Sequence, residues 1–319
     1  MKWKTLTSMN KLELSIIFWN CGVSPTRGAP KDASKYQLAT QLIYNMMVSD
    51  IDVICLVEVS KEFNNFLMWI INLMKLQYSL IDGTTKISRT RFDSCVIYKS
   101  SVFSKTRDIA VIKDEIPGAT IKAGQVFFLQ IADKELNFLV SHWPSQLNNQ
   151  VLQREGAAKA VRKWIDDTRN SNILENLIFL GDYNSTPYSI EIKEILMSSY
   201  SKEHCIKHSD FNILYNPSWK LIYDVHSYHS GCIILDKFLA NEPGTHYFPQ
   251  NLKEEWHVYD QVLFPSSFVM GQKNTWSYID HSLNVIKLGV SQNLSVWQSN
   301  NFDHLPVSLK LRSIISNVR

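Results

Sequence analysis

One stretch of the chain decides the fold: Phe179-Leu180-Gly181-Asp182-Tyr183-Asn184-Ser185-Thr186-Pro187. It follows directly on Leu177 and Ile178, and the apolar run 177–180 has the length and composition of a buried β-strand. The second half consists of turn-forming and polar residues. A strand that ends abruptly in Asp and Asn carries these side chains to the rim of a sheet, where α/β proteins place functional groups. Alone, the segment also fits an ordinary Gly-Asp turn.

Five other apolar runs begin or end in polar residues: Phe18-Trp19-Asn20, Leu56-Val57-Glu58, Val140-Ser141-His142, Asp260-Gln261-Val262-Leu263 and Asp303-His304-Leu305-Pro306-Val307. Each one alone fits a structural role, such as a turn cap or a hydrogen-bonded histidine. Together the six supply one Glu, three Asp, two Asn and two His at strand ends. Oxygen ligands of this kind suit Mg²⁺, and a His–Asp pair can take a proton from water. The combination indicates metal-assisted hydrolysis of a phosphodiester.

Helical periodicity lies between these strands, at residues 36–47, 61–76 and 153–168. The order is strand, helix, strand, helix, several strands and a second similar round, which favours two sheets covered by helices. There is no linker-like tract, and the chain has only 11 glycines. We therefore expect one domain over residues 1–319, with a core from about residue 14 to about residue 311. Residues 200–256 show no clear period, and we expect long loops there.

Composition excludes several classes of protein. Net charge is +3, apolar residues make up 45% and charged residues 20%, so the chain is neither disordered nor strongly basic. The five cysteines include no CxxC pair, which predicts a reduced, cytoplasmic protein. No secretory signal is evident, and the longest apolar stretch, residues 66–74, is too short to span a bilayer. A mild positive balance leaves room for a local basic patch.

The ordered motifs resemble the endonuclease/exonuclease/phosphatase superfamily. The series is Trp-Asn, Val-Glu-Val, Ser-His-Trp-Pro-Ser, Gly-Asp-x-Asn-x-x-Pro, Tyr-Asp-Gln-Val-Leu and Asp-His-Leu-Pro-Val, spread over nearly the whole chain. This superfamily includes pancreatic deoxyribonuclease, exonuclease III, neutral sphingomyelinases and inositol-polyphosphate 5-phosphatases. The resemblance implies a four-layer α/β sandwich, in which two packed mixed β-sheets are flanked by helices. It does not choose the substrate.

The resemblance also implies a metal site. Mg²⁺ is the expected cofactor, with Mn²⁺ as a substitute. Glu58 is expected to bind the ion, with Asn20 beside it and Asp303 in the metal shell or orienting its neighbours.

Catalytic roles follow from the same resemblance. Asp182 and Asn184 are expected to hold the attacking water and the scissile phosphate. His304, paired with Asp260, is expected to act as the base or as a phosphate ligand. His142 matches a position that is His in the deoxyribonuclease and sphingomyelinase branches. A second acid–His pair, Asp280 and His281, is interpreted as part of an insertion before the last strand.

Three cations, Lys86, Arg89 and Arg91, precede the strand at 94–98. The default interpretation is a solvated loop. In nucleases of the superfamily the corresponding loop lies against the nucleic-acid backbone, which predicts phosphate contacts here. Asp93, just after the cluster, is a candidate to orient His142.

The first functional hypothesis is therefore a Mg²⁺-dependent nuclease acting on DNA. The alternative is a phosphatase or phosphodiesterase acting on a lipid headgroup or on a soluble inositol or nucleotide phosphate. A membrane-acting enzyme would need an exposed apolar helix, and the one candidate, residues 63–73, is interpreted as a core helix. We therefore expect no membrane partner. A scaffold without activity is disfavoured because every expected polar position is filled.

Overall fold

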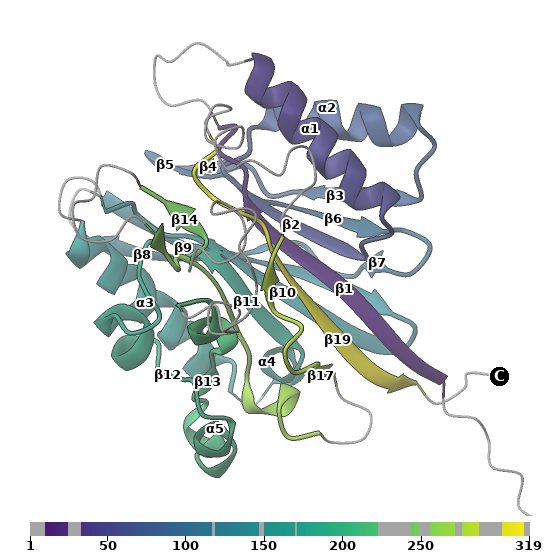
Figure 1. Cartoon of the computed structure of the whole chain (residues 1–319). Helices are drawn as coiled ribbons and strands as arrows, with labels where there is room; N and C mark the ends of the chain where they lie inside the picture. The colour runs from purple at the N-terminus through teal and green to yellow at the C-terminus, as the bar shows by residue number, and fades with distance from the viewer. Residues whose placement is uncertain are drawn as a thin grey trace, which may run out of the picture.

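The computed structural model describes residues 10–24, 33–116, 119–146, 150–169, 171–222, 244–248, 256–271, 276–286 and 302–315. Two large mixed sheets face each other in this part of the chain (Figure 1). The first sheet has the order β17-β19-β1-β2-β6-β3, with β18 also paired to β19. Its strands are β1 (Asn10–Asn20), β2 (Val53–Val57), β3 (Tyr78–Asp82), β6 (Cys95–Lys99), β17 (Ser277–Tyr278), β18 (Asn284–Val285) and β19 (Val307–Ile315).

The second sheet has the order β16-β11-β10-β9-β7, with β8 also paired to β9. Its strands are β7 (Ser104–Lys105), β8 (Ala110–Ile116), β9 (Ala119–Ile131), β10 (Lys134–His142), β11 (Leu177–Asp182) and β16 (Asp260–Leu263). Each sheet is mixed because one central pair is parallel, β1 with β2 and β10 with β11, while the other neighbours are antiparallel. Two parallel strands need a crossover between them, and a helix supplies it in each sheet.

Three hydrophobic clusters separate four layers. One cluster lies between the two sheets and includes Phe18, Phe127, Phe138 and Val262. A second packs helices α1 (Ala33–Val48) and α2 (Lys61–Leu73) on the outer face of the first sheet. A third packs α3 (Val151–Asp167) on the outer face of the second sheet. The predicted α/β class, with two mixed sheets flanked by helices, is confirmed.

Shorter elements complete the described chain. They are β4 (Thr85–Ile87), β5 (Thr90–Phe92), α4 (Asn172–Glu175), η2 (Glu191–Ile195), β12 (Ser198–Ser199), α5 (Lys202–Lys207), η3 (Ser209–Phe211), β13 (Leu214–Tyr215), η4 (Pro217–Ile222), β14 (His246–Tyr247), β15 (Trp256–His257) and η6 (Ser266–Phe268). The expectation of long loops at 200–256 is wrong for residues 202–222, where short elements follow one another. Residues 223–243 and 249–255 lie outside the described residues.

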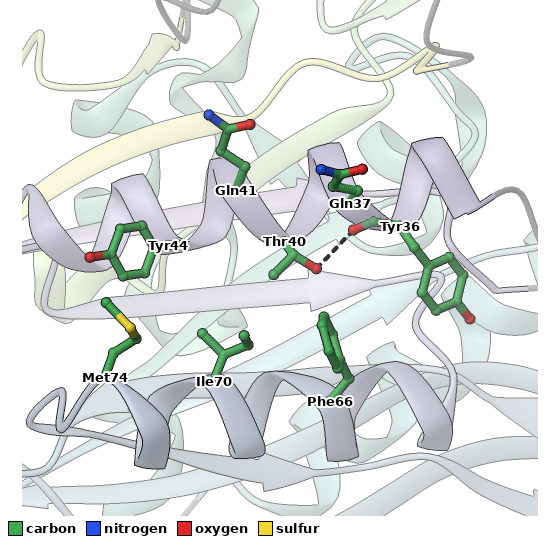
Figure 2. A pocket seen from close by; sticks show the side chains of 8 residues that line it. All are labelled: Tyr36, Gln37, Thr40, Gln41, Tyr44, Phe66, Ile70 and Met74. Atoms are coloured by element: carbon green, nitrogen blue, oxygen red, sulfur yellow. Dashed lines mark hydrogen bonds between the residues drawn. The ribbon is translucent and has the colours of Figure 1, made fainter.

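Helix α2 is only half a core helix, which corrects the interpretation of residues 63–73. Phe63, Leu67 and Ile71 are buried, yet Phe66 is 42% and Trp69 is 54% exposed. The outer side of α2 and the neighbouring α1 form an apolar groove of about 730 Å³, which Figure 2 shows from close by. The two helices run in the same direction there. None of the helices in the described part of the chain is long and apolar enough to span a bilayer.

Candidate active site

Strand register brings the predicted residues to one end of both sheets. Asn20 pairs with Val57 across the parallel strands β1 and β2, so Glu58 follows directly beside it. In the second sheet Asp182 pairs with His142 on one side and with Asp260 on the other. The carboxyl ends of neighbouring parallel strands meet at one edge of a sheet. Both sheets therefore deliver polar side chains to one rim.

Asn20 joins the two sheets through its side-chain amide. Its Nδ2 donates to Glu58 Oε1 at 3.0 Å and to Asp182 Oδ2 at 2.9 Å. Its Oδ1 accepts a hydrogen bond from the Gly22 backbone N–H at 3.1 Å. This arrangement fixes which end of the amide faces the carboxylates, because only the nitrogen can donate to both. Asn20 therefore holds the two carboxylates together and offers them a donor.

Two site residues have strained backbone conformations. Glu58 has a φ of 55° and Asn184 a φ of 48°, in the left-handed region that favours glycine. Such strain concentrates at functional sites, where the surroundings hold it in place. Asn184 is held by its backbone N–H, which donates to Asp182 Oδ1 at 3.0 Å, and by its side-chain amide, which donates to the Trp143 carbonyl at 3.0 Å.

Asp260 and His304 form a buried pair. His304 Nδ1 lies 2.8 Å from Asp260 Oδ2, and His304 Nε2 lies 3.6 Å from Asp182 Oδ2. Burial alone would lower the pKa of His304, but the charges of Asp260 and Asp182 raise it well above its usual value. Burial raises the pKa of the Asp260 carboxyl. Asp280, the acid of the second acid–His pair in the sequence, is exposed and ion-paired with Lys202. The structure therefore brings Asp260 and not Asp280 to His304.

His142 is held by two charged residues. Its Nδ1 lies 3.0 Å from Asp93 Oδ2 and 3.0 Å from Lys122 Nζ, and Lys122 also contacts Asp93 Oδ1 at 2.7 Å. Burial would raise the pKa of Asp93, but Lys122 and His142 outweigh it and hold the pKa well below its usual range. His142 Nε2 faces Glu58 Oε1 at 3.4 Å. Asp93 therefore orients His142 toward Glu58, and Lys122 completes the group.

Three sets of donors among the described residues could hold a metal ion, and two of them share Asp182. In the set that includes the predicted ligand Glu58, Glu58, His142 and Asp182 each offer a ligand atom, and these atoms lie within 4.8 Å of one another. Two carboxylates meet the preference of Mg²⁺ for oxygen. Asp303 lies elsewhere: its side chain is 61% exposed, and its Oδ2 is 3.8 Å from His246 Nε2. Among the described residues, it groups with His246 and His304 and not with Glu58, so of its two expected roles this position suits the orientation of neighbours.

A cleft of about 870 Å³ is lined by Glu58, His142, Asp182, Asn184, Asp303 and His304. Its walls include several residues that the sequence analysis did not assign: Lys122, His246, Phe248, His257 and Tyr259. Burial and the neighbouring His304 lower the pKa of His246 to about 4, which keeps its ring neutral. The Gly-Thr-His-Tyr segment at 244–247 was the available signal for His246.

The three predicted substrate cations lie outside this cleft. Lys86, Arg89 and Arg91 are exposed on the hairpin of β4 and β5, and they do not line it. Thr90, on the same hairpin, does line it.

Comparison with known proteins agrees with this geometry. Residues 31–295 match the profile of the Endonuclease/Exonuclease/phosphatase family. The chain belongs to this family. No curated protein is significantly similar to it in sequence.

Members of the endonuclease/exonuclease/phosphatase family act on phosphoesters. Several solved structures have the same fold as this chain. The human Nocturnin catalytic domain with bound sulfate is 14% identical, with a TM-score of 0.56, covering 96% of this chain and 98% of that one. TDP2 of D. rerio, complexed with a single-strand DNA product, is 12% identical, with a TM-score of 0.53 and coverages of 94% and 98%. A mannosyl-6-phosphatase of Bacteroides thetaiotaomicron is 12% identical, with a TM-score of 0.55 and coverages of 93% and 99%. At these identities the likeness establishes the fold alone.

Proposed function

We propose that this protein is a Mg²⁺-dependent phosphodiesterase that cleaves nucleic acid, with DNA as its main substrate. The proposal rests on where the lysine and arginine side chains lie relative to the cleft. Lys122 is the only lysine or arginine among the described residues that line the cleft, and Asp93 already neutralises it. Such a cleft suits one phosphate group, because a substrate with several phosphates needs several cations around it.

Further phosphates of a polymer would lie outside the cleft. Lys86, Arg89 and Arg91 stand exposed on the hairpin whose Thr90 reaches the cleft wall. Arg and Lys in that position would contact neighbouring backbone phosphates without reading bases. TDP2 of D. rerio, a protein of the same fold, has been solved in complex with a single-strand DNA product. A nuclease would use both the cleft and the hairpin, whereas a small phosphoester would contact the cleft alone.

Glu58 and Asp182 would hold the cation, with His142 beside them and Mn²⁺ as a substitute for Mg²⁺. Bound there, the ion would supply positive charge to the phosphate oxygens. Asn20 keeps the two carboxylates in place through the hydrogen bonds described above.

His304, with Asp260 bound to its Nδ1, would carry out the proton transfer. Asp260 accepts from Nδ1, which leaves His304 Nε2 to face Asp182 and the cleft. From there Nε2 can hold a phosphate oxygen while protonated, or take a proton from water once it is neutral. Asp182 and Asn184 would orient the attacking water and the phosphate.

The test is direct incubation of the purified protein with several substrates. Plasmid DNA, single-stranded DNA, RNA and a panel of nucleotide, inositol and sugar phosphates are each tested with Mg²⁺, Mn²⁺ or EDTA. The variant His304→Ala serves as the control for contaminating nucleases. We expect metal-dependent cleavage of nucleic acid that the variant loses. Release of phosphate from small molecules with intact nucleic acid would overturn the proposal in favour of a phosphatase.

A further inference from the structure

One wall of the cleft is built from aromatic rings that the catalytic chemistry does not use. We define this aromatic wall as His246, Phe248, His257 and Tyr259. The rings of His257 and Tyr259 are nearly parallel, with centroids 4.9 Å apart and an angle of 6°. His246 stacks on Tyr259 at 5.1 Å, and Phe248 lies beside His246 at 6.4 Å with an angle of 18°. The four residues therefore present their rings in related orientations along one side.

Backbone contacts fix the aromatic wall against the catalytic histidine. β14 and β15 pair His246 with His257, and His246 also forms a bridge with His304. The Tyr247 backbone N–H donates to the Asp303 carbonyl at 2.9 Å. The ring centroids of His246 and His304 are 4.5 Å apart. A group that lies against the wall is thus one side chain away from His304.

The wall has a buried part and an exposed part. His257 and Tyr259 are buried, and His246 is largely covered. Phe248, by contrast, lines the cleft and is 41% exposed. Core packing explains the buried rings, but it does not explain a phenyl ring that stays 41% exposed on the wall of a polar cleft.

We propose that Phe248 and the aromatic wall bind an unpaired nucleobase next to the scissile phosphate. This inference rests on the proposed function and narrows its substrate to single-stranded or terminal nucleotides. A base has a π-face that stacks on an aromatic side chain whatever its sequence. In a duplex that face is already occupied by neighbouring bases, so a paired base must first leave the stack. A cleft with one neutralised lysine and an aromatic side suits one phosphate with one ring system.

The first experiment compares single-stranded oligonucleotides that differ at one position. One carries a normal base beside the cleavage site, and the others carry an abasic residue on the 5′ or on the 3′ side. Removing a stacked base costs roughly 5- to 150-fold in affinity, so we expect KM to rise by that factor for one of the abasic substrates. Phe248→Ala should abolish most of this preference, and Phe248→Trp should keep it. Phe211→Ala, which changes an exposed phenylalanine away from the cleft, should keep it as well.

The same strand annealed into a blunt duplex should be a poorer substrate than the single strand. Equal KM values for the base-bearing and both abasic strands would overturn the inference and leave the nuclease function standing. A preference that survives Phe248→Ala would also overturn it.

A second experiment needs no cleavage at all. Equilibrium binding of thymidine 5′-monophosphate is compared with that of deoxyribose 5-phosphate, which lacks the base. We expect tighter binding of the nucleotide, and we expect Phe248→Ala to remove the difference. If no polymer is cleaved while this base preference is found, the nuclease proposal fails and the nucleobase site stands. Equal binding of the two compounds refutes the site independently of the reaction.

Discussion

Glu58 combines three observations at one residue. Its carboxylate accepts from Asn20, it faces His142, and its backbone has a left-handed conformation. We predict that Glu58→Gln raises the Mg²⁺ concentration needed for half-maximal activity by about tenfold or more, because an anionic ligand is lost. Titration of activity against Mg²⁺ measures this, with Glu203→Gln, an exposed acid on α5, as the control. An unchanged metal requirement would remove Glu58 from the metal site.

Asp260 and His304 should behave as one catalytic unit. Each of Asp260→Asn and His304→Ala is expected to lower kcat by roughly 10²–10⁴-fold, the usual contribution of a positioned acid–base group. The double variant should cost little more, because residues that act together are not additive. Asp280→Asn should be almost silent, since Asp280 is an exposed partner of Lys202. An inactive Asp280→Asn with an active Asp260→Asn would contradict this assignment.

Single residues also show what the sequence could predict. Asn20, Glu58, Asp182 and Asp260 could be located because each interrupts an apolar strand, and strand ends of one sheet meet. Lys122 could not, because it sits inside the long strand β9, where a single polar residue between apolar ones is an ordinary feature of a strand. Its role depends on a contact with Asp93, 29 positions away. Such a contact follows from tertiary packing, and no local pattern announces it.

At the scale of elements, the hairpin of β4 and β5 is a small, separable surface. We predict that replacing Lys86, Arg89 and Arg91 by Ala weakens binding of single-stranded DNA and raises KM at moderate salt. Each lost phosphate contact should flatten the dependence of log K on log salt by about 0.7. Binding across a salt series measures the slope. The same three changes at Lys163, Arg169 and Lys193, which are exposed and do not line the cleft, provide the control. Equal slopes for parent and hairpin variant would show that the hairpin does not touch the polyanion.

The larger elements were predictable, and the smaller ones were not. Helices α1, α2 and α3 lie where helical periodicity placed them, because each must bury an apolar stripe on a sheet. β14 and β15 have two residues each and are held by pairing with each other and by the bridge to His304. Elements this short have no period of their own, so the aromatic wall could not be read from the chain. The exposed side of α2 could not be predicted either. Hydrophobic spacing alone does not show whether a helix is covered by other elements on one side or on both.

At the scale of the whole molecule, the ion group of Asp93, Lys122 and His142 connects the segment before β6 of the first sheet to the second sheet, and it contributes to the stability of the fold. Asp93 follows β5, Lys122 lies on β9 and His142 ends β10. We predict that Asp93→Asn lowers the free energy of unfolding by about 3 kcal/mol, because Lys122 and His142, both largely covered, lose the carboxylate between them. Asp108→Asn, at an exposed pair with Lys105, should cost less than about 1 kcal/mol. Urea unfolding measures both.

The difference in the free energy of unfolding between the parent and Asp93→Asn should depend on pH, because the pKa values of Asp93 and His142 change on folding. The pKa of Asp93 is lowered on folding, so its contribution is present above the unfolded value of about 3.9 and is lost as the pH falls toward the folded one. Burial and Lys122 oppose protonation of His142, yet Asp93 and Glu58 raise its pKa overall. Its contribution is therefore complete below the unfolded value of about 6.5 and is lost at higher pH. The gap between parent and Asp93→Asn should be largest between about pH 4 and pH 6.5. A gap that is constant from pH 4 to pH 9 would rule out the ion group as its source.

The pairing of β1 with β19 has a consequence for how the enzyme comes into being. Trp19 donates from its indole nitrogen to the carbonyl of His304, a contact that spans 285 positions of the chain. Bringing such distant segments together requires closing a long loop, which costs conformational entropy. Asn20 and Glu58 come from one end of this span, and His304 comes from the other. A polypeptide that lacks either segment would therefore lack part of the proposed hydrolytic site, so we expect activity only after the two distant segments have come together in the folded chain.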